Sequence, residues 1–159
     1  MKKKLLVLVM ALASVVAVTG CEKKEEKKDE GTTTTTTQAA APTKLDCTLT
    51  EGKDSVRKTY YLTDGSITKI SYRESREQKD EKTAKSKRDA FDAKKENQYK
   101  GLTTGSSNSA KLYTFSYNFT LADMDDKAKE IYNKYFSETD GKSYEEVKNI
   151  LTAASYKCN

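Results

Sequence analysis

The stretch VRKTYYLTDGSITKISYR, residues 56–73, decides the fold, because its pattern is that of two strands joined by a tight turn. Its first half places apolar side chains on one face of an extended chain, namely Val56, Tyr60 and Leu62. Asp64-Gly65 follows, and this dipeptide is the strongest short signal for a β-hairpin. The second half returns as a strand in which Ile67 and Ile70 fall on opposite faces, which indicates a bulge.

Two further segments have the pattern of strands. Residues 45–50 alternate apolar and polar side chains, as in a half-buried strand. Between Ala110 and Phe119 the aromatic residues recur at a period of two, and we expect this row to pack under a helix; its members are Tyr113, Phe115, Tyr117 and Phe119. The preceding residues, 103–109, read as a loop of small side chains around Gly105.

Helices are predicted before and after the aromatic strand. Residues 74–100 are dense in Lys, Glu, Asp and Ala, most of which favour helix, and Ala84 and Phe91 form a thin apolar stripe. Gly101 follows as a candidate C-terminal cap.

Two helices are expected to close the chain. The first has Asp123 as a candidate N-cap, and its apolar residues fall at helical spacing: Met124, Ala128, Ile131 and Tyr135. The second begins with a capping box formed by Ser143 and Glu146. This order of elements predicts an α+β fold, with a small antiparallel sheet of about four strands and helices packed on one face.

The N-terminus has the pattern of an export signal. Three lysines precede an apolar run from Leu5 to Val18, which is shorter than the roughly 20 residues that span a bilayer. Val18-Thr19-Gly20-Cys21 looks like a bacterial lipobox, in which the cysteine is lipidated after cleavage. We therefore predict a lipoprotein signal peptide at residues 1–20 and lipidation, for example with palmitate, at Cys21.

A linker separates the predicted anchor from the predicted domain. Residues 21–44 comprise the lipidated cysteine and a Lys/Glu- and Thr-rich tract that has almost nothing to bury, and this tract is expected to be disordered. Residues 45–159 are then a single α+β domain. The chain has 29 Lys+Arg and 24 Asp+Glu, but three of the lysines leave with the signal peptide. The near-balanced charge that remains favours solubility over nucleic-acid binding.

Cys47 and Cys158 are the two cysteines of the predicted domain. Outside the cytoplasm, a disulfide between them would persist and would close a loop of more than 100 residues, worth about 4–5 kcal/mol by chain-entropy arguments. The alternatives are two free thiols, or a redox or metal pair. Two cysteines are a poor metal set, and the chain has no histidine to complete it.

Beside the lipobox, four stretches of the chain allow a comparison with a known family: residues 58–71, Tyr99-Lys100 with the following loop, residues 113–124 and residues 144–157. In these features the chain resembles the YehR-like family of small bacterial lipoproteins. Cys47, Cys158 and the threonine tract depart from the family pattern. The family's activity is not established, so the resemblance implies a fold and an envelope address but no catalytic residues.

Catalysis is not expected. Without histidine no Ser-His or Cys-His pair can form, and no glycine-rich phosphate loop is found in the sequence. The alternative function is a small envelope hydrolase that uses paired carboxylates such as Asp123 with Asp125 and Asp126. We predict no metal and no cofactor.

The leading hypothesis is a membrane-anchored extracytoplasmic lipoprotein with a non-catalytic binding or structural role in the cell envelope. Its expected partners are the cell membrane, through the lipid, and an envelope protein, polymer or small ligand, but not nucleic acid. Tyrosines are the candidates for an aromatic contact surface, although they also suit half-buried sheet faces: Tyr60, Tyr61, Tyr72, Tyr113 and Tyr117.

Overall fold

A computed structural model describes residues 43–159. Cys21, the predicted signal peptide and all but the end of the predicted linker lie outside the described residues. The main elements are β1 (Lys44–Glu51), β2 (Asp54–Thr63), β3 (Ser66–Glu77), α1 (Glu81–Asp92), β4 (Leu102–Ser109), β5 (Leu112–Thr120), α2 (Asp126–Phe136), α3 (Tyr144–Ala153) and β6 (Lys157–Cys158). Short 3-10 turns lie at Glu96–Gln98 and Leu121–Asp123.

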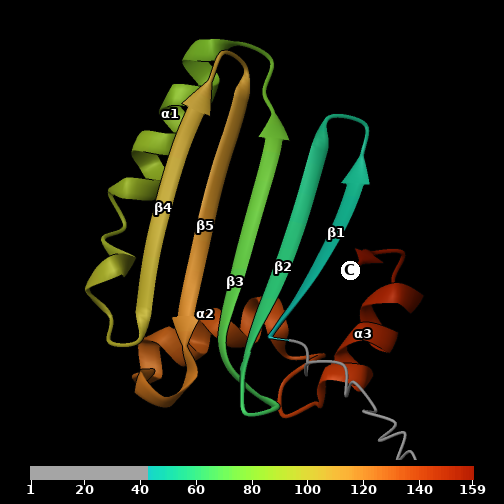
Figure 1. The fold of residues 1–159 in the computed structure, drawn as a ribbon. Helices are drawn as coiled ribbons and strands as arrows, with labels where there is room; N and C mark the ends of the chain where they lie inside the picture. The colour runs from blue at the N-terminus through green and yellow to red at the C-terminus, as the bar shows by residue number, and fades with distance from the viewer. Residues whose placement is uncertain (1–42) are drawn as a thin grey trace, which may run out of the picture. The chain divides into compact units, whose positions relative to one another are not determined.

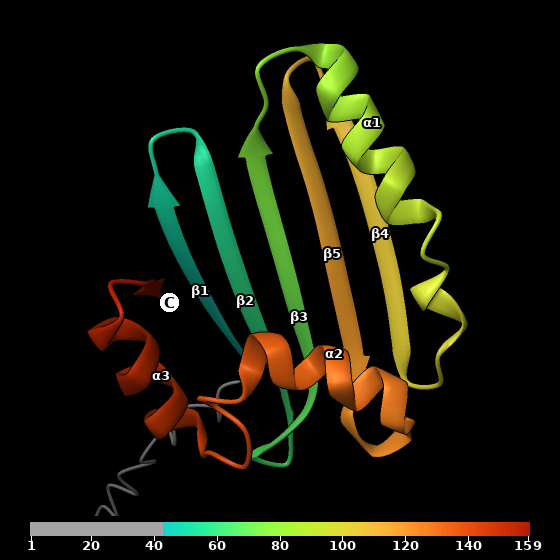
Figure 2. The same cartoon turned by 180° about the vertical axis from the view of Figure 1, so that it is seen from behind.

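The strands form one antiparallel sheet with the order β4-β5-β3-β2-β1-β6. Helices α1 and α2 lie over one face of it and α3 lies beside its β1 edge, as Figure 2 shows, and the opposite face faces the viewer in Figure 1 without a helix over it. One covered and one solvated face is a common arrangement for antiparallel sheets. The predicted α+β class, with an antiparallel sheet and helices, is confirmed.

The hairpin predicted from residues 56–73 forms as β2 and β3. Asp64 and Gly65 both have positive φ, 50° and 77°, as a two-residue hairpin turn of the primed kind requires. The register shifts between Tyr61 and Leu62, so that Leu62 pairs with Ile67 while Tyr60 pairs with Ile70. This irregularity places both isoleucines toward the core.

The sheet has six strands, so the prediction of about four was too low. The missed strands are β6, which has only two residues, and β4, which the sequence suggested to be a loop. In β4 only Leu102 is a buried apolar residue, and the helix-side positions below α1 are polar. Asp92 of α1 accepts a hydrogen bond from Ser106 (2.6 Å), and Arg88 donates to Asn108 (2.9 Å). Polar contacts with α1 therefore replace the apolar alternation that identifies most strands.

Helix boundaries also differ from the prediction. Strand β3 continues to Glu77, and α1 begins after Asp80, whose carboxylate accepts from the Thr83 amide. Gly101 (φ 75°) does not cap α1, which ends at Asp92. Asp125, not Asp123, is the N-cap of α2.

The capping box of α3 is confirmed. The Ser143 side chain accepts from the Glu146 amide, and the Glu146 side chain accepts from the Ser143 amide. No helix among residues 43–159 is long and apolar enough to cross a membrane.

Aromatic rings fill the space between the sheet and the helices. The Phe91 ring of α1 lies 5.3 Å from the Phe115 ring and 5.4 Å from the Tyr117 ring, as expected for an aromatic row under a helix. Phe136 of α2 is fully buried and meets Tyr60 edge-on at 5.9 Å. Each such buried ring contributes roughly 1.5–3 kcal/mol through lost water contact.

The predicted disulfide is present. Cys47 of β1 and Cys158 of β6 lie directly opposite each other, with their Cα atoms 4.1 Å apart and a separation of 111 positions in sequence. The bond fixes the end of the chain, after α3, to the edge of the sheet.

Candidate functional site: the bare face of the sheet

We call the side of the sheet without helices the bare face. It carries the side chains that alternate with the core residues along each strand. The strand registers arrange these side chains in rows that cross the sheet, and neighbouring rows are about 7 Å apart, the length of two residues of an extended chain.

The central row contains three cations. We call it the arginine row; from one edge of the sheet to the other it consists of Gly105, Ser116, Arg73, Arg57, Thr48 and Lys157. Arg57 and Arg73 are direct cross-strand neighbours, and all three cations are exposed.

Above the arginine row, every side chain carries a hydroxyl. This row consists of Ser107, Thr114, Ser75, Ser55 and Thr50. The Ser75 and Thr114 hydroxyls are hydrogen-bonded at 2.8 Å.

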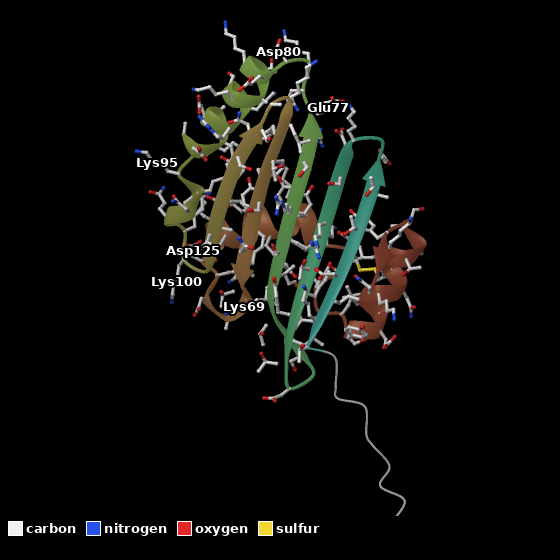
Figure 3. All side chains as sticks on the ribbon, turned by 45° about the horizontal axis from the view of Figure 1, so that its top comes forward. Lys69, Glu77, Asp80, Lys95, Lys100 and Asp125 are labelled. Atoms are coloured by element: carbon white, nitrogen blue, oxygen red, sulfur yellow. A yellow bond between two sulfur atoms is a disulfide. The ribbon has the colours of Figure 1, made fainter. Side chains whose placement is uncertain are left out.

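Below the arginine row lie two more rows. The first is again polar and consists of Thr103, Asn118, Ser71, Thr59 and Asp46. The second contains Lys69, Tyr61 and Lys44. Figure 3 shows Lys69 toward the lower end of this face. The four rows contain no aliphatic side chain, so this part of the face is not an uncovered piece of core. The row beyond the hydroxyls holds Leu112 and Glu77, and Glu77 is paired with Lys53 at 2.7 Å.

Asp46 is the one carboxylate within these four rows, and its own neighbours neutralise it. It is nearly buried and accepts from Thr59 Oγ1 (2.5 Å) and Arg57 Nε (3.3 Å), and Lys44 Nζ lies 2.5 Å away. Burial acts to raise the pKa of Asp46, but the hydrogen bonds from Lys44, Thr59 and Arg57 outweigh it and leave the pKa below its usual value.

The remaining cations of the bare face have no such partner. The four rows hold five cations: Lys44, Arg57, Lys69, Arg73 and Lys157. Among the described residues, no carboxylate lies within ion-pair distance of Lys69, Arg73 or Lys157. Positive charge without compensation on a polar face favours an anionic ligand.

A hollow opens beside Arg73 because Gly105 has no side chain there. It has a volume of about 250 Å³ and is lined by Arg73, Gly105, Ser106, Ser107, Thr114 and Ser116. Sites for drug-sized ligands have roughly 300–1,000 Å³, so this hollow suits one small group.

The tyrosines predicted as a contact surface lie on both sides of the sheet. Tyr61 is 42% exposed and belongs to the bare face, between Lys69 and Lys44. The other four are buried on the helix side and do not form an exposed surface, so the prediction is wrong for Tyr60, Tyr72, Tyr113 and Tyr117. Burial raises the pKa of Tyr113 to about 12, which keeps its hydroxyl neutral.

The paired carboxylates proposed for a hydrolase include one that is engaged in the fold. Asp125 accepts from the Ala128 amide (2.8 Å) and from the Lys100 amide (2.9 Å), and these hydrogen bonds lower its pKa. Figure 3 shows Lys100 and Asp125 near each other beside the lower end of β4. No group of acidic or cysteine side chains within residues 43–159 has the geometry to hold a metal ion.

A second hollow, on the helix side, is lined by Glu51, Asp54, Val56 and Glu74 among others. The Glu74 carboxylate is buried, but it already accepts from the Tyr72 hydroxyl and from Arg76. The fold itself thus uses this carboxylate, and the bare face is the stronger candidate site.

Sequence reasoning did not identify the basic residues of the bare face. A signal was present, because residues 69, 71, 73 and 75 alternate as Lys, Ser, Arg and Ser. That alternation marks the solvent side of β3, but only the register shows that Arg57, Ser116 and Gly105 lie in line with Arg73.

Comparison with known proteins supports the fold alone. No family model matches the chain, and a search of curated proteins found no significant relative. Among solved structures, the NMR structure of a protein from Streptococcus pneumoniae TIGR4 is similar, with a TM-score of 0.54 and 13% identity, over 88% of this chain and 99% of that one. At this identity, the likeness indicates a shared arrangement of strands and helices.

Proposed function

We propose that this chain is a lipid-anchored extracytoplasmic protein whose bare face binds an anionic polymer of the cell envelope, of the phosphodiester class, without catalysis. Cys21 supplies the anchor and the linker up to residue 44 supplies the reach. The resemblance to YehR-like lipoproteins supports the same envelope address. The polymer is the partner class that the charges of the bare face favour.

The observation that carries this proposal is the uncompensated charge of Arg73, Lys69 and Lys157 within four rows that contain no aliphatic side chain. Arg73 stands directly opposite Arg57, and like charges facing each other across two strands destabilise a sheet. An anionic ligand would remove that repulsion.

The shape and chemistry of the bare face suit an extended chain. The arginine row crosses all six strands, so a polymer lying along it meets the adjacent pair Arg73 and Arg57 and then, beyond Thr48, Lys157. Arginine donates paired hydrogen bonds to phosphate oxygens, and serine and threonine hydroxyls donate single ones. Tyr61 adds an exposed ring beside Lys69.

Binding of soluble poly(glycerol phosphate) to the full chain in detergent micelles tests the proposal. The test variant carries Lys69→Gln, Arg73→Gln and Lys157→Gln, which leaves Asp46 and its partners intact. The matched control carries Lys82→Gln, Lys87→Gln and Lys142→Gln, which removes the same charge from exposed positions outside the bare face. Neutral dextran and a single-stranded oligonucleotide of equal charge are the comparison ligands.

The test variant should bind the polymer roughly tenfold more weakly, since three exposed ion pairs at about 0.5 kcal/mol each amount to a factor of ten. The affinity of the control should stay within about twofold of that of the wild type, because the lysines that it lacks lie outside the bare face and would not contact the phosphates. Equal loss in both variants, or tighter binding of the oligonucleotide, would show a general charge effect and overturn the proposal.

The anchor is tested separately. A Cys21→Ser chain should lose incorporation of labelled palmitate and should leave the membrane fraction in a carbonate wash, because one or more buried acyl chains hold the wild type there. A Cys47→Ser chain is the control for the loss of a cysteine and should stay labelled. Retention of the Cys21→Ser chain in the membrane would contradict lipid anchoring.

A further inference from the structure

The hollow at Gly105 lies where the arginine row meets the hydroxyl row. Ser116 is the register partner of both Gly105 and Arg73, so the three positions lie side by side on β4, β5 and β3. Two residues further along the strands, and on the same face, Ser107 pairs with Thr114. One guanidinium and three hydroxyls thus surround a space that has no side chain at its centre.

Gly105 is not required by backbone strain. It is the one glycine described whose φ is outside the left-handed region, and a Cβ built on it would meet the Ser116 hydroxyl oxygen at 3.2 Å. A side chain at residue 105 is therefore compatible with the strand but would occupy the hollow. In a strand interior, glycine often marks a place where a ligand or backbone approaches closely.

The donors around the hollow match a tetrahedral oxyanion. Ser116 Oγ lies 3.4 Å from the Gly105 carbonyl oxygen, a long contact that leaves its hydrogen available to a better acceptor. Arg73 has no carboxylate partner among residues 43–159 and is exposed beside the hollow. No carboxylate lines the hollow.

We propose that this hollow, formed by Arg73, Gly105, Ser107, Thr114 and Ser116, is a subsite for a single phosphate group. The inference rests on the proposed function, because the phosphate of a polymer lying along the arginine row would enter here. The Arg73 guanidinium would donate two hydrogen bonds to the phosphate, and the hydroxyls would donate hydrogen bonds to its remaining oxygens.

Two sources can present this chemistry, a phosphodiester within a polymer and a free or terminal phosphate. The full chain in detergent micelles is therefore titrated with dimethyl phosphate in one arm and with inorganic phosphate in the other, and ¹⁵N amide shifts are recorded. Sodium chloride at equal ionic strength is the blank. The variants are Gly105→Val, which fills the hollow, and Arg73→Gln. The matched control is Thr103→Val, which changes the same face of the same strand two residues away.

Saturable shifts are expected at the amides of residues 105, 107 and 116 in both arms or in the diester arm. The Gly105→Val and Arg73→Gln chains should lose at least about tenfold in affinity, equal to the loss of roughly 1.4 kcal/mol, whereas Thr103→Val should keep it. Saturation with inorganic phosphate alone would assign the hollow to a free or terminal phosphate and overturn its role as a polymer subsite.

The subsite would be overturned if no amide shifts, if sodium chloride causes the same shifts, or if the shifts persist in the Gly105→Val chain. The proposed function stands or falls on a different result, the affinity of the Lys69, Arg73 and Lys157 variant for the polymer. If Gly105→Val binds poly(glycerol phosphate) as well as the wild type while that variant does not, the bare face binds the polymer and the hollow is not its subsite.

Discussion

Arg57 and Arg73 face each other directly across β2 and β3 on the solvent side of the sheet. Arg57 is paired with Asp46 at 3.1 Å, whereas Arg73 has no acidic partner within the described part of the chain. The repulsion between these two like charges lowers the stability of the fold. A residue that lowers stability in this way is often kept because it binds a ligand.

Replacement of Arg73 by Gln should therefore stabilise the protein while it weakens polymer binding. We expect a gain of about 0.2–1 kcal/mol in the free energy of unfolding, the size of a cross-strand pair effect. Urea denaturation at low ionic strength measures it, and added salt should shrink the gain because it screens the repulsion. Lys82→Gln, on α1, is the control and should change little. A less stable Arg73→Gln chain would mean that Arg73 supports the fold.

The disulfide should be a major source of stability, because it joins residues 111 positions apart. In a chain with Cys47→Ala and Cys158→Ala, the free energy of unfolding should fall by about 4 kcal/mol, since the unfolded chain is no longer closed into a loop. The midpoint of urea unfolding, measured without reductant, checks this value. The unfolding midpoint of wild type treated with reductant should fall toward that of the variant. Equal midpoints with and without reductant would contradict a structural role for the bond.

Asp46 should make the protein sensitive to acid. Its folded-state pKa lies below the ordinary value of 3.8, so its charge stabilises the fold above that pH, and this contribution is lost as the pH falls through the lowered value. Asp46→Asn should cost about 1–2 kcal/mol at neutral pH, and the difference from wild type should shrink as the pH drops from about 5 to about 2. Urea midpoints over this pH range measure it. A difference that stays constant with pH would contradict the assignment.

Gly101 should tolerate no side chain. Its φ is +75°, and a Cβ there would lie 2.5 Å from the Met124 amide nitrogen, where the loop before α2 passes the start of β4. Gly101→Ala should reduce the free energy of unfolding by about 3 kcal/mol or more, because one backbone segment must move. Gly52→Ala is the matched control, with φ +62° and nothing within 4 Å, and it should cost only about 1 kcal/mol. If the two substitutions cost equally, the positive φ alone would account for both losses, and the close approach of Met124 to Gly101 would have no effect.

The sequence was sufficient for the parts of the fold that bury apolar side chains at a regular period. The hairpin at Asp64-Gly65, the aromatic row of β5 and the α3 capping box all carry local signals, and the structure contains each of them. Strand β4 carries none, because its helix side is satisfied by hydrogen bonds from α1 instead of by apolar packing.

The candidate site was harder to predict from the sequence, because its residues are not neighbours in the chain. Arg57, Arg73 and Gly105 are 16 and 32 residues apart in sequence, and pairing through β2, β3, β5 and β4 alone brings them into one row. The tyrosines were candidates for an exposed surface because of their number, but four of the five are buried on the helix side of the sheet. Charge and register, and not aromatic content, distinguish the bare face.

The central claim is that the bare face binds an anionic polymer. It is tested most directly by the ¹⁵N amide shifts of the full chain in detergent micelles as poly(glycerol phosphate) is added. We predict that the shifted amides gather along the arginine row and around Lys69 on β1, β2, β3, β5 and β4, and that added salt abolishes the shifts. Shifts centred on the helices, or spread evenly over every exposed lysine, would contradict the account.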